Sequence, residues 1–325
     1  MAGDRVTIYD VAAECGVSTA TVSRALAQPD KVHAQTRERV LAAAERLGYR
    51  REPGTRTLGA RHTGAIAMVV PDITNPYYFA AITGAERRAQ AAGLTLVLVN
   101  TEENAAQELS AVERLVGRVG GFVLASSRLP DAEIRSLAAR TALVLLNRHV
   151  EGISSAMVEQ DQGSRQIVHH LVSLGHEHLV YLGGPVNSWV RHQRWSALTR
   201  AAADEGIRID QLGPYRPSSV DGGAAADTGL RTGATGFIAH NDLLAIGVLQ
   251  RLRSRGVAVP EEVSLVGYDN MFVAQVCTPT LTTLGGEYEE AARHGVELLL
   301  EGRRDRQVVL PSSLAIREST GRAPS

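Results

Sequence analysis

Cysteine is scarce in this 325-residue chain, which holds only two, Cys15 and Cys277. They lie far apart and provide neither a disulfide framework nor a CxxC metal pair. Four histidines do gather within ten residues, but their spacing is not that of a zinc-binding HExxH helix. These are His169, His170, His176 and His178. We therefore expect no metal site.

Long apolar runs are also missing. No stretch of eighteen apolar residues could span a bilayer, and the opening "MAGDRVTIYD" lacks the basic-then-apolar pattern of a signal peptide. With 44% hydrophobic and 21% charged residues, the composition is typical of a globular protein. We expect a cytoplasmic protein with no membrane partner, long enough for two or three domains.

The motifs of several common enzyme classes are absent as well. The sequence contains no GxGxxG, no GxxxxGK[ST] and no GxSxG, so dinucleotide, P-loop and serine-hydrolase chemistry lack their residues. Asp72, Asp242 and Asp269 each follow an expected strand, but no nucleophile or base is indicated beside them. We expect no catalytic residues and no cofactor.

Charge is unevenly divided along the chain, although the formal net charge is only −1. Residues 1–62 carry ten basic side chains against seven acids, whereas the remainder carries 24 against 28. A basic N-terminal segment followed by an acidic remainder indicates that only residues 1–62 bind a polyanion. The signal is weak alone, because many solvated helices carry as much charge.

Residues 1–48 are predicted to form three short helices. Thr7 is a possible N-cap of the first helix, Gly16 suits a tight turn, and Ser18 can cap a second helix over 19–26. The third helix, "TRERVLAAAERLGY", carries apolar residues at helical spacing. The residues expected to face inward are Val40, Leu41, Ala44 and Leu47.

Helix, glycine turn, helix and a bracing helix is the arrangement of a helix-turn-helix DNA reader. In "GVSTATVSRAL", small hydroxyl side chains let the second helix approach the major groove, and Arg24 can bond guanine O6 and N7. A three-helix domain with an ordinary polar outer face is the alternative. The candidate DNA-binding residues are Thr7, Ser18, Thr19, Ala20, Thr21, Ser23, Arg24 and Leu58.

Residues 49–62, "YRREPGTRTLGARH", are predicted to be a basic hinge linker. Pro53 and Gly54 oppose a stable free helix. Leu58 is a lone large apolar side chain, which could pack on the body or act as a wedge between base steps.

Residues 63–325 alternate apolar strand-like runs with amphipathic helices. Runs such as "AIAMVVP", "LTLVLVN" and "HLVYLGG" predict an α/β fold with two lobes of doubly wound parallel sheets. In such folds ligands bind beyond the carboxyl ends of the strands. Those ends are "PDITNPYY", "LNRHV", "GGPVNSW", "HND" and "YDN".

Two classes of function remain after these observations. One is a transcription regulator controlled by a small effector, and the other is a sugar-binding protein or sugar enzyme whose α/β body carries the activity. The second class would be favoured by a signal peptide or a catalytic constellation. The helix-turn-helix pattern and the basic linker favour the regulator.

Consecutive segments resemble the lac repressor (LacI/GalR) family of bacterial transcription regulators. They include "VTIYDVAAECGVSTATVSRAL", "AMVVPDITNPYYF", "GFIAHNDLLAIGVLQRLRSRGVAVPEEVSLVGYDN" and "PTLTTL", and the resemblance covers nearly the whole chain. It implies a non-enzymatic regulator, repressor-type, that binds pseudo-palindromic double-stranded operator DNA as a homodimer. Leu58 stands where the family's hinge helix carries a leucine, although Pro53, Gly54 and Thr55 depart from that helix's usual sequence. The end "RESTGRAPS" has no heptad helix for four-chain assembly, which favours a dimer.

The resemblance also implies a periplasmic-binding-protein-like body that holds its effector between two lobes. Arg, Asn and Asp can bond the vicinal hydroxyls of a sugar, and a sugar is favoured, although the tyrosines near residue 77 leave a purine open. Glu159 stands where the family more often has Asp, either capping the next helix or reaching the ligand. The implied ligand-binding residues are Tyr77, Tyr78, Asn147, Arg148, Trp189, Arg194, Asn241, Asp269 and Tyr288.

Overall fold

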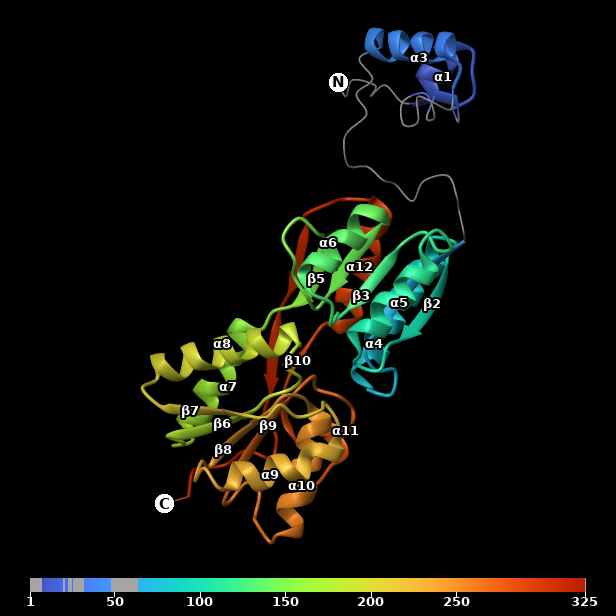
Figure 1. The fold of residues 1–325 in the computed structure, drawn as a ribbon. Helices are drawn as coiled ribbons and strands as arrows, with labels where there is room; N and C mark the ends of the chain where they lie inside the picture. The colour runs from blue at the N-terminus through green and yellow to red at the C-terminus, as the bar shows by residue number, and fades with distance from the viewer. Residues whose placement is uncertain (1–7, 20, 23–24, 26–31, 48–63, 325) are drawn as a thin grey trace. The chain divides into compact units, whose positions relative to one another are not determined.

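The structure is a computed structural model that describes residues 8–19, 21–22, 25, 32–47 and 64–324 (Figure 1). The chain divides into two compact units, Met1–Thr55 and Arg56–Ser325. The predicted linker 49–62, including Leu58, lies outside the described residues, so its bounds stay a prediction. In the part of the chain that is described, none of the helices has the length and apolar character needed to cross a membrane.

The first unit contains α1 (Ile8–Cys15) and α3 (Ala34–Arg46), and Thr19 and Thr21 between them are also helical. Gly16 has a φ of +61°, a conformation that glycine adopts without strain, so the predicted turn is confirmed. Ser18 Oγ accepts a hydrogen bond from the Thr21 backbone N–H at 3.2 Å, which confirms the predicted cap.

One inward-facing residue of α3 is predicted wrongly. Leu41 is 43% exposed, whereas Val40, Ala43 and Ala44 are buried. Positions 40, 43, 44 and 47 share one helical face, and position 41 is turned about 100° from position 40. Among the described residues of this unit, the buried core contains Val11, Ala12, Cys15, Val22, Ala25, Val40, Ala43 and Ala44.

The second unit has two lobes, each with a six-stranded sheet between helices. In the first lobe the strand order is β11-β5-β4-β3-β1-β2, and all neighbouring strands are parallel. Its strands are β1 (Ala65–Val70), β2 (Thr95–Asn100), β3 (Phe122–Ala125), β4 (Leu143–Leu146), β5 (Ser155–Val158) and β11 (Gln307–Leu310). Its helices are α4 (Tyr77–Ala91), α5 (Ala105–Leu115), α6 (Asp131–Arg140) and α12 (Tyr288–Glu301).

The second lobe repeats this plan with the order β12-β10-β9-β8-β6-β7, in which only β12 is antiparallel to its neighbour. Its strands are β6 (His178–Leu182), β7 (Arg208–Leu212), β8 (Gly236–Ala239), β9 (Ser264–Tyr268), β10 (Thr282–Gly286) and β12 (Ser312–Ala315). Its helices are α7 (Asp161–Ser173), α8 (Trp189–Asp204), η2 (Ser219–Asp221), α9 (Gly222–Leu230), α10 (Asp242–Ser254) and α11 (Val273–Val276). The predicted fold, two lobes of doubly wound sheets, is confirmed.

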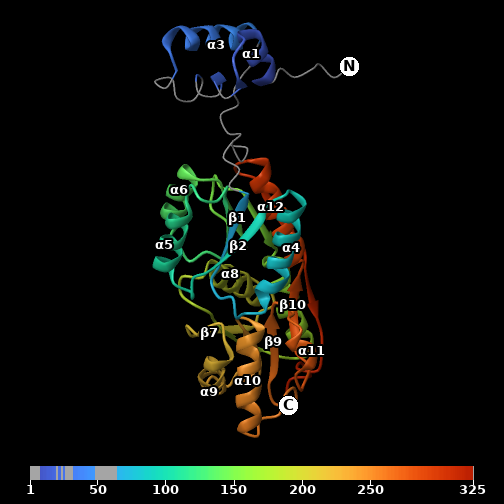
Figure 2. The same cartoon turned by 90° about the vertical axis from the view of Figure 1, so that its right-hand side faces the viewer.

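The chain passes between the lobes three times: from β5 to α7, from β10 to α12, and from β11 to β12. In β1 the side chains alternate between two cores. Ile66 and Met68 face the core formed with α4 and α12, whereas Ala67 and Val69 face the core with α5 and α6. Figure 2 shows α4 and α12 on one flank of this lobe and α5 and α6 on the other. Both faces of the sheet are therefore covered, as a parallel sheet requires.

α4 and α12 pack closely because Gly84 has no side chain. A Cβ at this position would lie 2.0 Å from the backbone oxygen of Glu289. Gly295, inside α12, is different: a Cβ there would have only the Val123 Cγ1 nearby, at 3.9 Å.

We predict that Gly84→Ala lowers the free energy of unfolding by about 1–3 kcal/mol, because the added methyl group forces the two helices apart. Gly295→Ala is the matched control and should stabilise the protein by up to about 1 kcal/mol through helix propensity. Urea unfolding of both variants measures the difference. Equal shifts of the same sign would contradict this account of the helix contact.

Candidate functional site

A cavity lies between the two lobes, at the carboxyl ends of the parallel strands of both sheets. The segments that follow β1 to β5 form one wall, and those that follow β6 to β9 form the other. This is where α/β folds bind ligands. The lining residues are Asn75, Tyr77, Tyr78, Glu103, Ser126, Arg128, Asn147, Gln160, Ser188, Val190, Arg194, Pro217, His240, Asn241 and Asp269.

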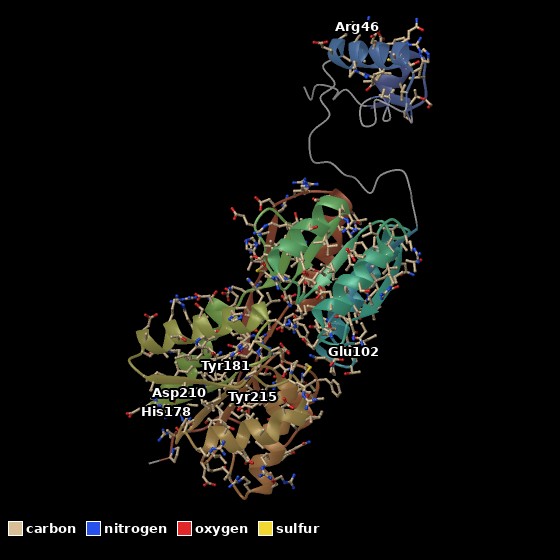
Figure 3. All side chains as sticks on the ribbon, in the orientation of Figure 1. Arg46, Glu102, His178, Tyr181, Asp210 and Tyr215 are labelled. Atoms are coloured by element: carbon tan, nitrogen blue, oxygen red, sulfur yellow. The ribbon has the colours of Figure 1, made fainter. Side chains whose placement is uncertain are left out.

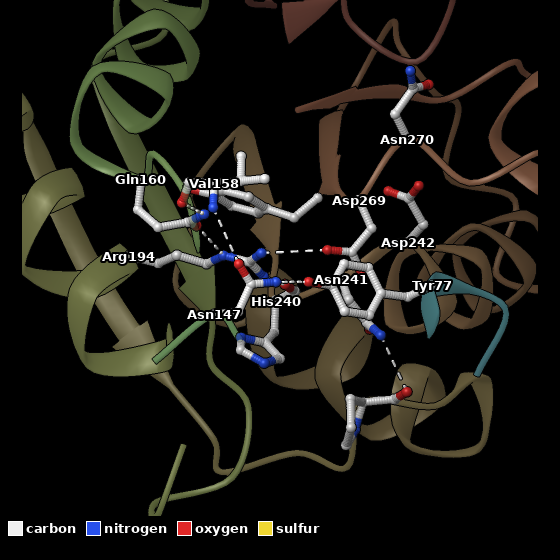
Figure 4. A network of polar contacts seen from close by, with 12 residues as sticks. Tyr77, Asn147, Val158, Gln160, Arg194, His240, Asn241, Asp242, Asp269 and Asn270 are labelled. Atoms are coloured by element: carbon white, nitrogen blue, oxygen red, sulfur yellow. Dashed lines mark hydrogen bonds and ion pairs between the residues drawn. The ribbon is translucent and has the colours of Figure 1, made fainter. Parts of the chain in front are cut away.

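Arg194, on α8, is the centre of the polar network at this cavity (Figure 4). Its side chain is buried, with Nε donating to Gln160 Oε1 at 2.9 Å and Nη2 to Asp269 Oδ1 at 3.3 Å. Nη1 donates to the carbonyl oxygen of His240. The guanidinium also lies over the Tyr268 ring, 3.9 Å from its centroid, a favourable cation–π distance. These contacts fix the orientation of the guanidinium.

The first lobe contributes a second buried guanidinium. Arg128 Nε donates to Glu103 Oε2 at 2.6 Å, and its Nη1 donates to the Ser126 carbonyl oxygen at 2.8 Å. Each lobe therefore presents one arginine–carboxylate pair to the cavity, Arg128 with Glu103 and Arg194 with Asp269. Such groups can donate to and accept from the hydroxyls of a polar ligand.

Two asparagines at strand ends complete the polar lining. Asn147 has a φ of +52°, and its Nδ2 donates to the Tyr77 hydroxyl while its Oδ1 accepts from the Val158 N–H at 3.2 Å. Asn241 caps α10 by accepting from the Leu244 N–H at 3.0 Å. Asn241 therefore both caps a helix and lines the cavity.

Burial changes the ionisation of the cavity's acid and histidine. It raises the pKa of Asp269 to about 7, against the opposing charge of Arg194. Burial also lowers the pKa of His240 well below its ordinary value, and the positive charges of Arg194 and Arg128 add to this effect. At neutral pH His240 is therefore uncharged, and the fixed positive charges belong to the arginines.

The open space inside the cavity is small, about 40 Å³. Pockets that enclose small molecules typically measure roughly 300 Å³ or more. A molecule the size of a sugar therefore enters only when the lobes part or when the lining side chains give up contacts to one another.

Six of the nine predicted ligand-binding residues line this cavity: Tyr77, Tyr78, Asn147, Arg194, Asn241 and Asp269. Arg148 does not. Its guanidinium donates to the Ser127 carbonyl at 2.8 Å and to Asp131 Oδ1 at 2.7 Å, within the first lobe. These partners keep Arg148 out of the cavity lining, so the structure does not bring it together with the other six, and its ligand-binding role stays a prediction.

Trp189 and Tyr288 are also absent from the lining. Trp189 is the first residue of α8, and its neighbours Ser188 and Val190 line the cavity in its place. Tyr288 lies behind Tyr77, with the two ring centroids 4.7 Å apart in an edge-on arrangement. It supports a lining residue without reaching the cavity itself.

Several polar lining residues are not among the predicted ones, and they include Glu103, Arg128, Gln160 and His240. Each follows the end of a strand, which is the signal that could have identified them. Glu159 was left open between two roles, and the structure shows it capping α7. Its carboxylate accepts from the N–H groups of Gln162 at 2.7 Å and Gly163 at 3.1 Å.

The clustered histidines make separate structural contacts. His178 and Asp210 lie on the neighbouring strands β6 and β7, with Nε2 and Oδ2 2.9 Å apart (Figure 3). His176 contacts the hydroxyls of Thr235 at 2.8 Å and Ser264 at 2.9 Å. These contacts hold strands of the second lobe together.

Of the predicted DNA-binding residues, the structure describes Ser18, Thr19 and Thr21. Ser18 is exposed, the other two are half-buried, and the hydroxyls of Ser18 and Thr21 lie 2.9 Å apart. The remaining predicted residues lie outside the described part of the chain; they are Thr7, Ala20, Ser23, Arg24 and Leu58.

Two family models match the chain. Residues 7–52 match the bacterial regulatory proteins of the lacI family, and residues 168–320 match the periplasmic binding protein-like domain. The chain is 31% identical over 331 residues to the HTH-type transcriptional repressor CytR of Escherichia coli, covering 98% of this chain and 97% of that protein. It is 31% identical over 302 residues to the HTH-type transcriptional regulator GalR of Escherichia coli, covering 90% of this chain and 88% of that protein.

Solved structures show the same likeness. A transcriptional regulator CelR–cellobiose complex is 26% identical with a TM-score of 0.72, covering 97% of this chain and all of that one. The lac repressor dimer bound to operator and the anti-inducer ONPF is also 26% identical with a TM-score of 0.72, covering 98% of this chain and all of that one.

We predict that Asp269 makes the protein less stable as the pH rises from about 4 to about 7. The folded state retains the proton on this acid, with a pKa of about 7 against 3.8 for an ordinary Asp, so it binds more protons than the unfolded state in that window. The loss is on the order of 4 kcal/mol, since one pKa unit is worth about 1.4 kcal/mol.

Asp269→Asn removes this slope. Urea unfolding at several pH values between 4 and 7.5 should show the wild type losing stability relative to the variant as the pH rises. Parallel stability curves for the two proteins would contradict the raised pKa of Asp269.

Proposed function

The chain belongs to the LacI family of bacterial regulatory proteins and is a DNA-binding transcription regulator controlled by an effector, and we propose that it is a cytoplasmic homodimeric repressor of a pseudo-palindromic operator. We further propose that its effector is a small sugar-like molecule held between the two lobes. The observation that carries the proposal is the pair of buried arginine–carboxylate contacts facing one cavity, Arg128 with Glu103 and Arg194 with Asp269.

The chemistry of the lining supports a sugar over a purine. Most lining side chains are amides, hydroxyls, guanidiniums or carboxylates, which bond hydroxyl groups in pairs. Among the described residues, the aromatic rings at the cavity are those of Tyr77, Tyr78 and His240, and the Tyr77 ring is packed edge-on against two other tyrosines. The CelR relative is named as a cellobiose complex, which agrees with a carbohydrate effector.

The coupling is a population shift between arrangements of the lobes. An effector that contacts both walls of the cavity stabilises one arrangement, and the arrangement that it favours differs in operator affinity. The lobes are joined by three chain crossings, and a change in their arrangement is the step by which we expect the cavity to act on the rest of the protein. The lac repressor relative is described as a dimer on its operator, which supports the proposed dimer.

The effector is identified by a thermal-shift screen against D-ribose, D-xylose, D-glucose, cellobiose, cytidine and adenine. A compound at 100 times its Kd stabilises the protein by about 2.7 kcal/mol. A sugar that also changes operator affinity supports the proposal. A response to adenine alone would replace the sugar by a purine.

We predict that Asp269→Ala retains operator binding but loses the change in operator affinity that the effector causes in the wild type. Asp227→Ala is the matched control, because Asp227 forms ion pairs with Arg251 and Arg255 and does not line the cavity. Fluorescence anisotropy with labelled operator measures both. The site assignment is wrong if a folded Asp269→Ala protein loses operator binding, or if it responds like the control.

We predict that Arg24→Ala weakens discrimination between the operator and single-base variants by about 1–3 kcal/mol, because the guanidinium is expected to bond a guanine. Arg46→Ala is the control, since Arg46 forms an exposed ion pair with Glu14 at 3.3 Å. Competition binding against a set of mutated operators gives the result. Uniform weakening on every sequence would instead assign Arg24 to a phosphate contact.

A further inference from the structure

At the first of the three chain crossings between the lobes, one side chain both donates and accepts a hydrogen bond. Gln160 lies between β5 of the first lobe and α7 of the second lobe. Its Nε2 donates to the Val158 carbonyl oxygen at 3.0 Å, and its Oε1 accepts from Arg194 Nε at 2.9 Å (Figure 4). An amide is suited to this position because it offers a donor and an acceptor at one end.

Both ends of this bridge continue into a wall of the cavity. On the first-lobe side, the Val158 N–H donates to Asn147 Oδ1 at 3.2 Å, and Asn147 Nδ2 donates to the Tyr77 hydroxyl. On the second-lobe side, Arg194 contacts Asp269 at 3.3 Å. The hydrogen bonds therefore form one connected path from α4 of the first lobe to the end of β9 in the second.

We infer that Gln160 is the positioning residue that ties the lobe arrangement to the contents of the cavity. It acts through Arg194, which it holds at the crossing, and its bond to Val158 orients the amide. The inference rests on the proposed function only in that the same cavity takes the effector.

The number of N–H groups on the Arg194 guanidinium explains how its hydrogen bond to Gln160 can persist when a ligand binds. Nε carries a single proton, which it donates in the hydrogen bond to Gln160 Oε1. Nη1 and Nη2 carry two protons each, and the contacts to His240 and Asp269 use one of each pair. A ligand can therefore accept hydrogen bonds from the second Nη protons while the bond from Nε to Gln160 persists. We expect a movement of the guanidinium to be transmitted through this bond to the crossing between β5 and α7.

The test measures the distance between the lobes in the full-length protein without DNA or any small molecule. Spin labels are placed on Ala106→Cys, at the start of α5, and Asn187→Cys, after β6. Both sites are exposed and lie at the carboxyl ends of their sheets. The native Cys15 and Cys277 are replaced by Ala, and double electron–electron resonance gives the distance distribution.

Gln160→Leu should broaden this distribution and shift it to longer distances, because Arg194 loses its acceptor at the crossing. Gln162→Leu, the same change at an exposed position two residues along, should leave the distribution as in the parent protein. Gln160→Glu keeps an acceptor for Arg194 but loses the donor to the Val158 carbonyl oxygen, so it should restore the parent distribution in part. This rescue separates a lost bond from general damage, and the same samples are checked by thermal unfolding.

A parent-like distribution for Gln160→Leu would overturn the inference, and so would a Gln160→Glu distribution as broad as that of Gln160→Leu. The result does not depend on the effector screen, because no ligand is present. A screen without any response would count against the proposed function and leave the role of Gln160 to be decided by the distances alone.

Discussion

The buried guanidinium of Arg194 is the contact on which the arrangement of the cavity depends. It joins the ends of β8 and β9 to the crossing that leads out of the first lobe. A buried charge is costly unless it has partners, and here Asp269, a carbonyl oxygen and an amide oxygen accept three hydrogen bonds from the guanidinium. Because Nη1 and Nη2 each keep a second proton, the guanidinium that stabilises the protein without a ligand is also available for binding one.

The parallel sheets explain why these groups meet. Each lobe places the carboxyl ends of its strands at one edge, and the two edges face each other across the cavity. Helices cover both faces of each sheet, so the loops at the strand ends are the positions left for polar side chains. The close contact of α4 and α12 at Gly84 holds the second chain segment of the first lobe, which returns from the second lobe, against the first segment.

Much of the fold could be predicted from the sequence, because its central strands are short continuous apolar runs. The run "AIAMVVP" became β1, whereas β7, "RIDQL", and β12, "SSLA", were not predicted, since their polar residues hide the strand signal. Arg194 and Asp269 were assigned by resemblance to the family. The Arg128–Glu103 pair could not be predicted, because it depends on β2 and β3 both flanking β1, a strand order that composition and spacing do not reveal. Arg148 was also assigned by resemblance, and its contacts to Ser127 and Asp131 could not be predicted, because its position in the sequence does not determine which partners a long side chain finds.

The central claim is that the cavity and the DNA-binding unit are energetically linked, and linkage is reciprocal. The most direct measurement is a pair of titrations with the compound found in the screen: operator binding with and without the compound, and compound binding with and without operator. The account predicts that both affinities change by the same factor and in the same direction. A compound that binds the cavity with one affinity, whether or not operator is present, would contradict it.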